Sequence, residues 1–152
     1  MNVTLRPWTQ ADAEFVVKVR NIPELMRWFR QDEPLTVEGQ RAFMNSFNGQ
    51  IYNGQIIEAD GQPVGICSIN IASREFGIAV LPEWQKKGIA TEAMLKLLDS
   101  APYAHSEVFV DNPALSWYLH KLGFKATGVK ERAYYKKGVG LVDVVYIQRG
   151  HA

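Results

Sequence analysis

The sequence contains a single cysteine, Cys67, among its 152 residues. One cysteine cannot form a disulfide within the chain, which excludes a small disulfide-stabilised secreted scaffold and favours a reducing compartment. No apolar run approaches the roughly 20 residues that cross a bilayer. Residues 1–8 also lack the apolar stretch of a signal peptide. We therefore expect a cytoplasmic protein that does not associate with membranes.

The chain also lacks an excess of either charge. Its 17 Lys and Arg residues nearly balance its 16 Asp and Glu residues, which leaves a net charge of +1. Such a balance gives no support for a nucleic acid or a membrane surface as the partner. Residues 101–152 are more basic than the rest, with seven basic and four acidic side chains. This segment is either a solvated basic face or the rim of a site for an anionic ligand.

Several catalytic motifs are missing from the sequence. It has neither the G-x-x-x-x-G-K-[ST] phosphate loop nor the G-x-S-x-G nucleophile motif. The three histidines, His105, His120 and His151, have no metal-ligand spacing among themselves or with Cys67, so we expect no metal site. Cys67 lies in an apolar strand, which favours a buried structural thiol over a nucleophile.

What is present is an ordinary globular composition, with 47% hydrophobic and 22% charged residues. The length predicts one domain over residues 1–152. Hydrophobic periodicity and turn signals predict the following elements. Strands are expected at 3–6, 55–59, 63–71, 74–81, 107–110, 124–132 and 141–148, and helices after Asp12, at 25–29, after Thr36, at 88–99 and at 113–122. Asn48-Gly49 and Asn53-Gly54 are predicted turns, and Asp60-Gly61 a hairpin turn.

This order of elements predicts an α+β fold with a mixed sheet. The β-α-β unit around residues 76–110 should be a parallel crossover. At its centre a strand ends at Leu81, and Pro82 to Gly88 lead into the helix at 88–99. A helix N-terminus presents unpaired N–H groups and the positive end of the dipole, and Gly88 lets an anion approach the backbone. These features indicate a phosphate or pyrophosphate site, although such glycine-containing turns are common.

Two motifs make the interpretation more specific. Residues 85–90, Gln-Lys-Lys-Gly-Ile-Ala, match the [QR]-x-x-G-x-[GA] motif of the GNAT superfamily of N-acetyltransferases. Residues 112–124, from Asn112 to Lys121-Leu122-Gly123-Phe124, resemble a later segment of the same family. The resemblance implies a GNAT-like, mostly antiparallel seven-stranded sheet with about four flanking helices, splayed between strands four and five. The pattern is closest to the ribosomal-protein N-terminal and aminosugar acetyltransferase branches.

The resemblance also implies acetyl-coenzyme A (acetyl-CoA) as co-substrate and no metal. The fourth strand would pair with the pantetheine arm through the backbone of Ile78, Ala79 and Val80. Asn112 would touch the arm or the substrate side. The pyrophosphate would be held by Gln85, Lys86, Lys87, Gly88, Ile89, Ala90 and Thr91.

The reaction implied is direct attack of a primary amine on the thioester. Glu75 is the candidate base, and its alternative role is an exposed strand-end residue paired with Arg74. Many family members place a catalytic tyrosine where this chain has Leu119. Tyr118 is the nearest tyrosine and the candidate acid, although it lies about 100° around the helix. Its alternative role is packing or substrate contact.

The acceptor is expected to be a small-molecule or peptide amine, with Trp28 and Phe29 as candidate substrate contacts. These two aromatic residues could equally belong to the core or to a lid. The protein should be a monomer or a homodimer. Two other readings stay open: a non-catalytic GNAT-like module that binds an acyl-CoA or a protein partner, and an unrelated α+β domain in which residues 80–92 form only a tight turn.

Overall fold

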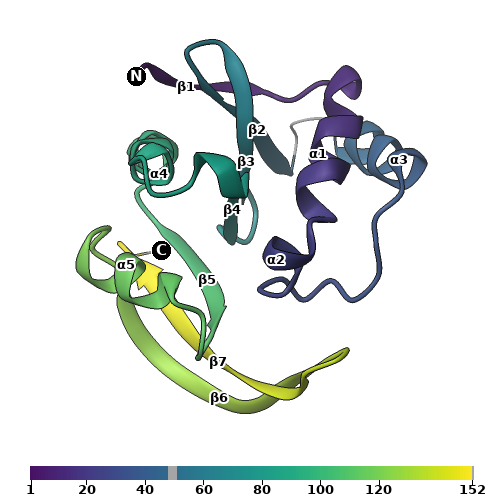
Figure 1. Cartoon of the computed structure of the whole chain (residues 1–152). Coiled ribbons are helices and arrows are strands. Elements are labelled where there is room, and N and C mark those ends of the chain that lie inside the picture. Colours follow the sequence, from purple (N-terminus) through teal and green to yellow (C-terminus); the bar gives the residue numbers. More distant parts are fainter. Residues whose placement is uncertain (48–50, 152) are drawn as a thin grey trace.

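The fold is built on two antiparallel sheets (Figure 1). A computed structural model describes residues 1–47 and 51–151. One sheet has the order β1-β2-β3-β4, with strands Val3–Pro7, Tyr52–Ala59, Gln62–Asn70 and Phe76–Val80. The other has the order β5-β7-β6, with strands Ala104–Phe109, Gly140–Arg149 and Lys125–Lys136. The helices are α1 (Ala13–Arg20), α2 (Pro23–Met26), α3 (Val37–Phe47), α4 (Ile89–Asp99) and α5 (Ala114–His120).

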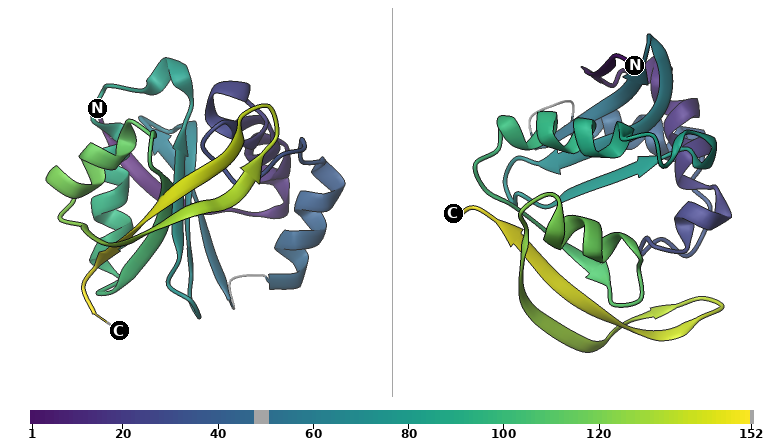
Figure 2. Two further views of the ribbon diagram at one scale, coloured as in Figure 1. Left: turned by 90° about the horizontal axis from the view of Figure 1, so that it is seen from below. Right: turned by 60° about the vertical axis from the view of Figure 1, so that its left-hand side comes forward.

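Helices cover both faces of the four-stranded sheet (Figures 1 and 2). On one face α4 buries Ile89 and Met94 in a cluster that also contains Val64. On the other face Val16 and Val19 of α1 pack against Ile56 together with residues of α3. The predicted α+β class is confirmed. Among the described residues, no helix is long and apolar enough to cross a membrane.

The β2–β3 hairpin confirms one predicted turn and corrects another. Asp60 and Gly61 form the turn with positive φ angles of 51° and 82°, which match the right-handed twist of a hairpin. The turn predicted at Asn53-Gly54 is wrong, since Gly54 lies inside β2. A Cβ atom there would stand 1.9 Å from a ring carbon of Trp8, so the glycine permits close packing. Asn48-Gly49 lies outside the described residues.

The two sheets meet where β4 and β5 run side by side. Glu75 and His105 form an isolated parallel bridge, in which the N–H of His105 donates to Arg74 O at 3.1 Å. The Ser106 hydroxyl donates to Phe76 O at 3.1 Å. Beyond these contacts the strands part, which confirms the expected splay between strands four and five. The splay divides the seven strands into two sheets, where one mixed sheet was expected.

The β6–β7 hairpin is longer than predicted and reaches the α2 region (Figure 1). β6 continues to Lys136, with register shifts between Ala126 and Gly128 and between Lys130 and Tyr134 that bend the ribbon. The Lys136 ammonium is buried and donates to the backbone carbonyls of Met26 and Phe29, at 3.0 and 2.8 Å, and of Gln31. The tip of this hairpin therefore fixes the segment that follows α2.

Candidate active site

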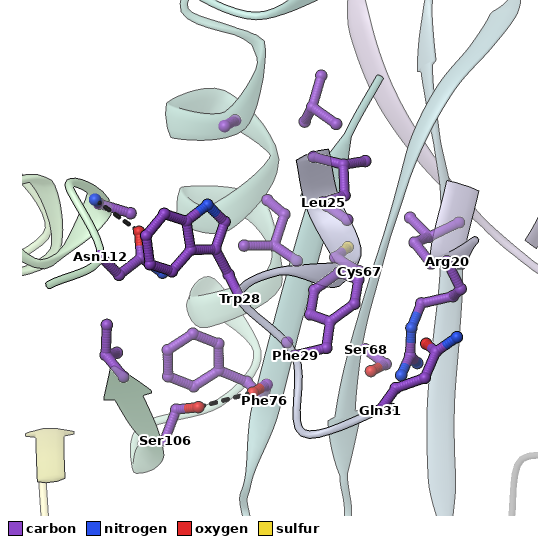
Figure 3. Close-up of a pocket in the computed structure, with 18 of the residues that line it drawn as sticks. Arg20, Leu25, Trp28, Phe29, Gln31, Cys67, Ser68, Phe76, Ser106 and Asn112 are labelled. Carbon is purple, nitrogen blue, oxygen red and sulfur yellow. Dashed lines mark hydrogen bonds between the residues drawn. The ribbon is translucent and has the colours of Figure 1, made fainter. Parts of the chain in front are cut away.

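A cleft of about 1570 Å³ surrounds the free edge of β4. One end is lined by α4, α5 and β5, and the other by α1, α2 and residues 28–36. Figure 3 shows Arg20, Phe29 and Gln31 at one end, and Asn112 on the opposite side. The cleft therefore joins the predicted cofactor end to the predicted acceptor end.

The turn before α4 is shaped by two residues in left-handed conformations, Lys86 at φ 62° and Gly88 at φ 81°. The Gln85 side chain donates from Nε2 to Val80 O at 3.0 Å, which holds the turn against the end of β4. The first helical bond runs from Glu92 N to Gly88 O. The N–H groups of the first turn are therefore free of intrahelical partners. In the described part of the chain, no heavy atom beyond the chain neighbours lies within 4 Å of a Cβ built on Gly88, so open space faces the backbone there.

Six of the seven residues predicted to hold the pyrophosphate line the cleft. Lys87 is not among the lining residues, and its side chain is exposed. Ile89 is 1% exposed and packs in the core, so only its backbone can serve a ligand. Thr91 accepts a hydrogen bond from the Trp117 indole at 2.9 Å, which ties α5 to α4.

The edge of β4 offers backbone groups to the gap between the sheets. Alternate residues of an antiparallel strand turn their N–H and C=O groups toward the partner strand. The N–H of Leu81 donates to Val64 O at 2.9 Å, so the odd-numbered residues of β4 bond to β3. Ile78 and Val80 therefore turn their backbone groups into the gap. Ala79, the third predicted residue, bonds to β3 and can offer the gap only its side chain.

Asn112 has a structural role at the start of α5. Its side-chain oxygen accepts the N–H of Ala114 at 2.9 Å, and its backbone oxygen accepts the N–H of Leu115 at 3.1 Å. The residue also lines the cleft (Figure 3). Capping orients the side chain and leaves its amide nitrogen available to a ligand.

Tyr118 is buried and also lines the cleft. Its ring packs edge-on against Phe76 and Phe124, with centroids 5.7 Å away in both cases. Burial raises the pKa of the phenol above its usual value. Among the described residues, the hydroxyl has no hydrogen-bond partner. Tyr118 therefore packs in the core and lines the cleft, and its role as acid stays a prediction.

Glu75 belongs to an ion-pair network that sequence reasoning missed. Its carboxylate binds Arg30 at 3.0 Å, whereas the expected partner was Arg74. The Arg30 guanidinium also lies 3.9 Å from the carboxylate of Glu107. The Tyr134 hydroxyl donates a hydrogen bond to the Glu107 carboxylate. The bond to Glu107 raises the pKa of Tyr134. Four elements distant in sequence supply this network, so no local spacing could have revealed it.

The acceptor end contains both predicted aromatic residues, Trp28 and Phe29 (Figure 3). Trp28 stacks under Arg27, whose guanidinium carbon lies 4.3 Å from the ring centre. Phe29 lies under Arg20 at 4.7 Å. Arg20 lines the cleft, and burial lowers the pKa of its guanidinium. The sequence motifs did not single out Arg20 as a site residue, because its place in the cleft depends on how α1 packs.

Cys67 lies on β3 beside the cleft and is 1% exposed. Burial raises the pKa of its thiol to about 12, so the thiolate nucleophile is not populated near neutral pH. This supports a structural thiol. Among the described residues, no group of three His, Cys, Asp or Glu side chains is placed to hold a metal ion.

The chain is similar to known acetyltransferases. It is 32% identical over 104 residues to a spermidine N(1)-acetyltransferase from Escherichia coli K12, a match that covers 64% of this chain and 56% of that protein. The chain thus spans little more than half the length of this curated relative. The motifs in the sequence pointed instead to the ribosomal-protein and aminosugar branches.

Solved structures share the fold along nearly the whole chain. A spermidine N-acetyltransferase from Vibrio cholerae, crystallised with CoA and spermine, superposes with a TM-score of 0.85 at 23% identity, covering 96% of this chain and 94% of that one. A phosphinothricin acetyltransferase from Sinorhizobium meliloti, in complex with acetyl-CoA, gives 0.83 at 19% identity, covering 98% and 88%. These TM-scores show that the chain shares its fold with both proteins.

The family is established by sequence. The model of the acetyltransferase (GNAT) domain matches residues 2–125, which include both motifs and the whole of the cleft's α4 and α5 wall. The chain belongs to the GNAT acetyltransferase domain family.

Proposed function

We propose that this protein is an acetyl-CoA-dependent N-acetyltransferase that acts on a primary amine of a small molecule. The observation that carries the proposal is the continuity of one cleft. It joins the N-terminus of α4, the free backbone edge of β4 and a separate end lined by aromatic and charged side chains. A cofactor and an acceptor can therefore meet at the edge of β4.

The residues present suit acetyl-CoA. The open space at Gly88 and the free N–H groups of α4 can receive a pyrophosphate. The backbone N–H and C=O of Ile78 and the N–H of Val80 can pair with an extended amide chain as a neighbouring strand would, while the Val80 carbonyl accepts a bond from Gln85. When bound, acetyl-CoA supplies the acetyl thioester that the amine attacks.

The side chains of the cleft have matching roles in this proposal. Glu75 takes a proton from the attacking amine, directly or through water. An N–H of Ile78 or Val80 donates to the oxyanion that develops during the attack. Tyr118 is the candidate that gives a proton to the leaving thiolate. Burial raises the pKa of its phenol, which makes it a weak donor, so a water molecule is the alternative proton source.

The test is a calorimetric titration with acetyl-CoA, followed by thiol release with a panel of primary amines that includes spermidine. Binding in the micromolar range, about −8 kcal/mol, with turnover of at least one amine supports the proposal. Binding without turnover of any amine favours the non-catalytic module. The absence of binding contradicts the proposal at its first step.

A further inference from the structure

Arg20 is a charged residue without a counter-ion. The ion pairs Arg6–Asp12, Arg27–Asp111 and Arg30–Glu75 have distances of 2.8, 2.8 and 3.0 Å. Among the described residues, Arg20 has neither a carboxylate partner nor a hydrogen bond, and its Nε is buried without a partner. The cleft therefore contains a cation that has no carboxylate partner among the described residues, and its favourable electrostatic neighbour is Tyr52.

This arrangement is costly in the free protein. Burial of an unpaired charge or of an unsatisfied N–H group is unfavourable, and the lowered pKa of Arg20 reflects that desolvation. The Phe29 ring, 4.7 Å from the guanidinium carbon, offers only a weaker cation–π contact. A ligand oxyanion would satisfy the Nε–H and the charge together, because the guanidinium fork matches two oxygens.

The position of Arg20 is that of an acceptor contact. Ser68 of β3 and Gly77 of β4 are paired in register and line the same cleft. Apart from its chain neighbours, none of the described residues has a heavy atom within 4 Å of a Cβ built on Gly77, so the sheet surface there is open. Gln31 is held by hydrogen bonds from its Nε2 to Asn21 and Glu33, and its Oε1 is buried without a partner. An unsatisfied donor, Arg20 Nε, and an unsatisfied acceptor, Gln31 Oε1, therefore belong to residues at this end of the cleft (Figure 3).

The carboxylates that line the cleft do not neutralise the charge of Arg20. Glu75 and Glu107 both face Arg30, which neutralises part of their charge. Glu24 has no ion pair among the described residues, but it is exposed to solvent at α2. A polyamine needs anionic groups along its path, and of the described carboxylates that line the cleft only Glu24 has no ion pair.

We infer that Arg20 binds an oxyanion, a carboxylate or a phosphate, on the amine acceptor, so that the substrate is an amine with an anionic group and not a polyamine. This inference rests on the proposed function, since it names the acceptor class of the same cleft. It identifies Arg20 as a specificity-determining residue for that reaction.

The first experiment compares acceptors of matched length. Glycine, β-alanine, 4-aminobutyrate and 6-aminohexanoate are assayed by thiol release against the corresponding n-alkylamines, spermidine and phosphoethanolamine. We expect kcat/KM for the best anionic amine to exceed that of its neutral match at least about tenfold. In Arg20→Gln this preference should disappear, mainly through KM, with acetyl-CoA affinity unchanged. Arg20→Lys should keep part of it, and Glu24→Gln should leave it intact.

Either of two results would overturn the inference: spermidine or a neutral amine as the best substrate, or an equal loss with every acceptor in Arg20→Gln. A preference for phosphoethanolamine over every amino acid would identify the oxyanion as a phosphate.

A binding measurement separates this inference from the proposed function. The Nε–H resonance of Arg20, identified by its loss in Arg20→Lys, is followed by NMR while the CoA-saturated protein is titrated with the same compounds. We expect it to shift with an anionic amine and not with the matched alkylamine. A shift without turnover would retain the anion site and reject the proposed function. Turnover without a shift would retain the proposed function and reject the anion site at Arg20. The absence of a shift with every compound therefore contradicts the inference.

Discussion

At the scale of single residues, Gly88 illustrates how a backbone can form a site. It lines the cleft with a φ of 81°, and open space lies where a side chain would stand. We expect Gly88→Glu to weaken acetyl-CoA binding at least about a hundredfold, because a carboxylate would occupy the space that an anion needs. Calorimetry measures this loss directly.

The matched control is Gly61→Glu. Gly61 has a φ of 82° and equally open surroundings, but it lies in the β2–β3 turn away from the cleft. Both variants carry the same left-handed strain of about 1–2 kcal/mol, so they should lose similar stability. Equal acetyl-CoA affinities in the two variants would show that the α4 turn does not hold the cofactor.

Glu75, which precedes β4, and Glu107 of β5 face the same arginine, and only one of them needs to act as the base. We expect Glu75→Gln to lower kcat by about a hundredfold or more while acetyl-CoA affinity stays unchanged, because a base contributes to turnover and not to cofactor binding. Steady-state rates from pH 6 to 9 check this. Full turnover in Glu75→Gln, with a collapse in Glu107→Gln, would reassign the role to Glu107.

At the scale of secondary-structure elements, the β6–β7 hairpin supports the acceptor wall. Lys136 is 5% exposed and binds backbone carbonyls after α2, including that of Phe29 at 2.8 Å. We expect Lys136→Met to cost about 2 kcal/mol of stability, because these carbonyls lose a charged donor. The KM for the amine should rise about fivefold, with acetyl-CoA affinity unchanged.

Lys137→Met is the control for that variant. Lys137 forms an exposed ion pair with Glu33 on the same segment, at 2.7 Å. Solvent screens such pairs, so the variant should change neither the melting temperature nor KM measurably. Equal effects in the two variants would mean that the charge of the hairpin, and not the buried contact, matters to the acceptor wall.

The packing of elements also explains which features could be predicted from the sequence and which could not. The turn at residues 85–90 was predictable because its chemistry is local: a strand end, a glycine and a helix start within a dozen residues. The group of Arg30, Glu107 and Tyr134 was not predictable, because the proximity of these residues depends on how distant elements pack. Gly54 misled the turn prediction for a related reason, since its neighbour is Trp8, far away in the chain.

At the scale of the whole molecule, the two sheets share a core but little backbone pairing. Phe76 of one sheet packs with Phe124 and Ile147 of the other side in a single cluster, while the Glu75–His105 bridge joins β4 to β5. A ligand in the gap beyond that bridge contacts both sheets at once. Its binding should therefore stabilise the protein as a unit.

Stabilisation by the ligand can be measured for the whole protein, as a melting temperature, and locally, as amide hydrogen exchange. Acetyl-CoA at 100 times its dissociation constant should add about 2.7 kcal/mol of stability and raise the melting temperature by roughly 5–10 °C. Hydrogen exchange at the amides of Ile78 and Val80 should slow, because the ligand gives them partners, whereas Gly77 and Ala79 already bond to β3. Gly88→Glu should show neither change. A higher melting temperature without slower exchange at Ile78 and Val80 would place the ligand outside the gap, because only a chain paired with β4 can satisfy both amides.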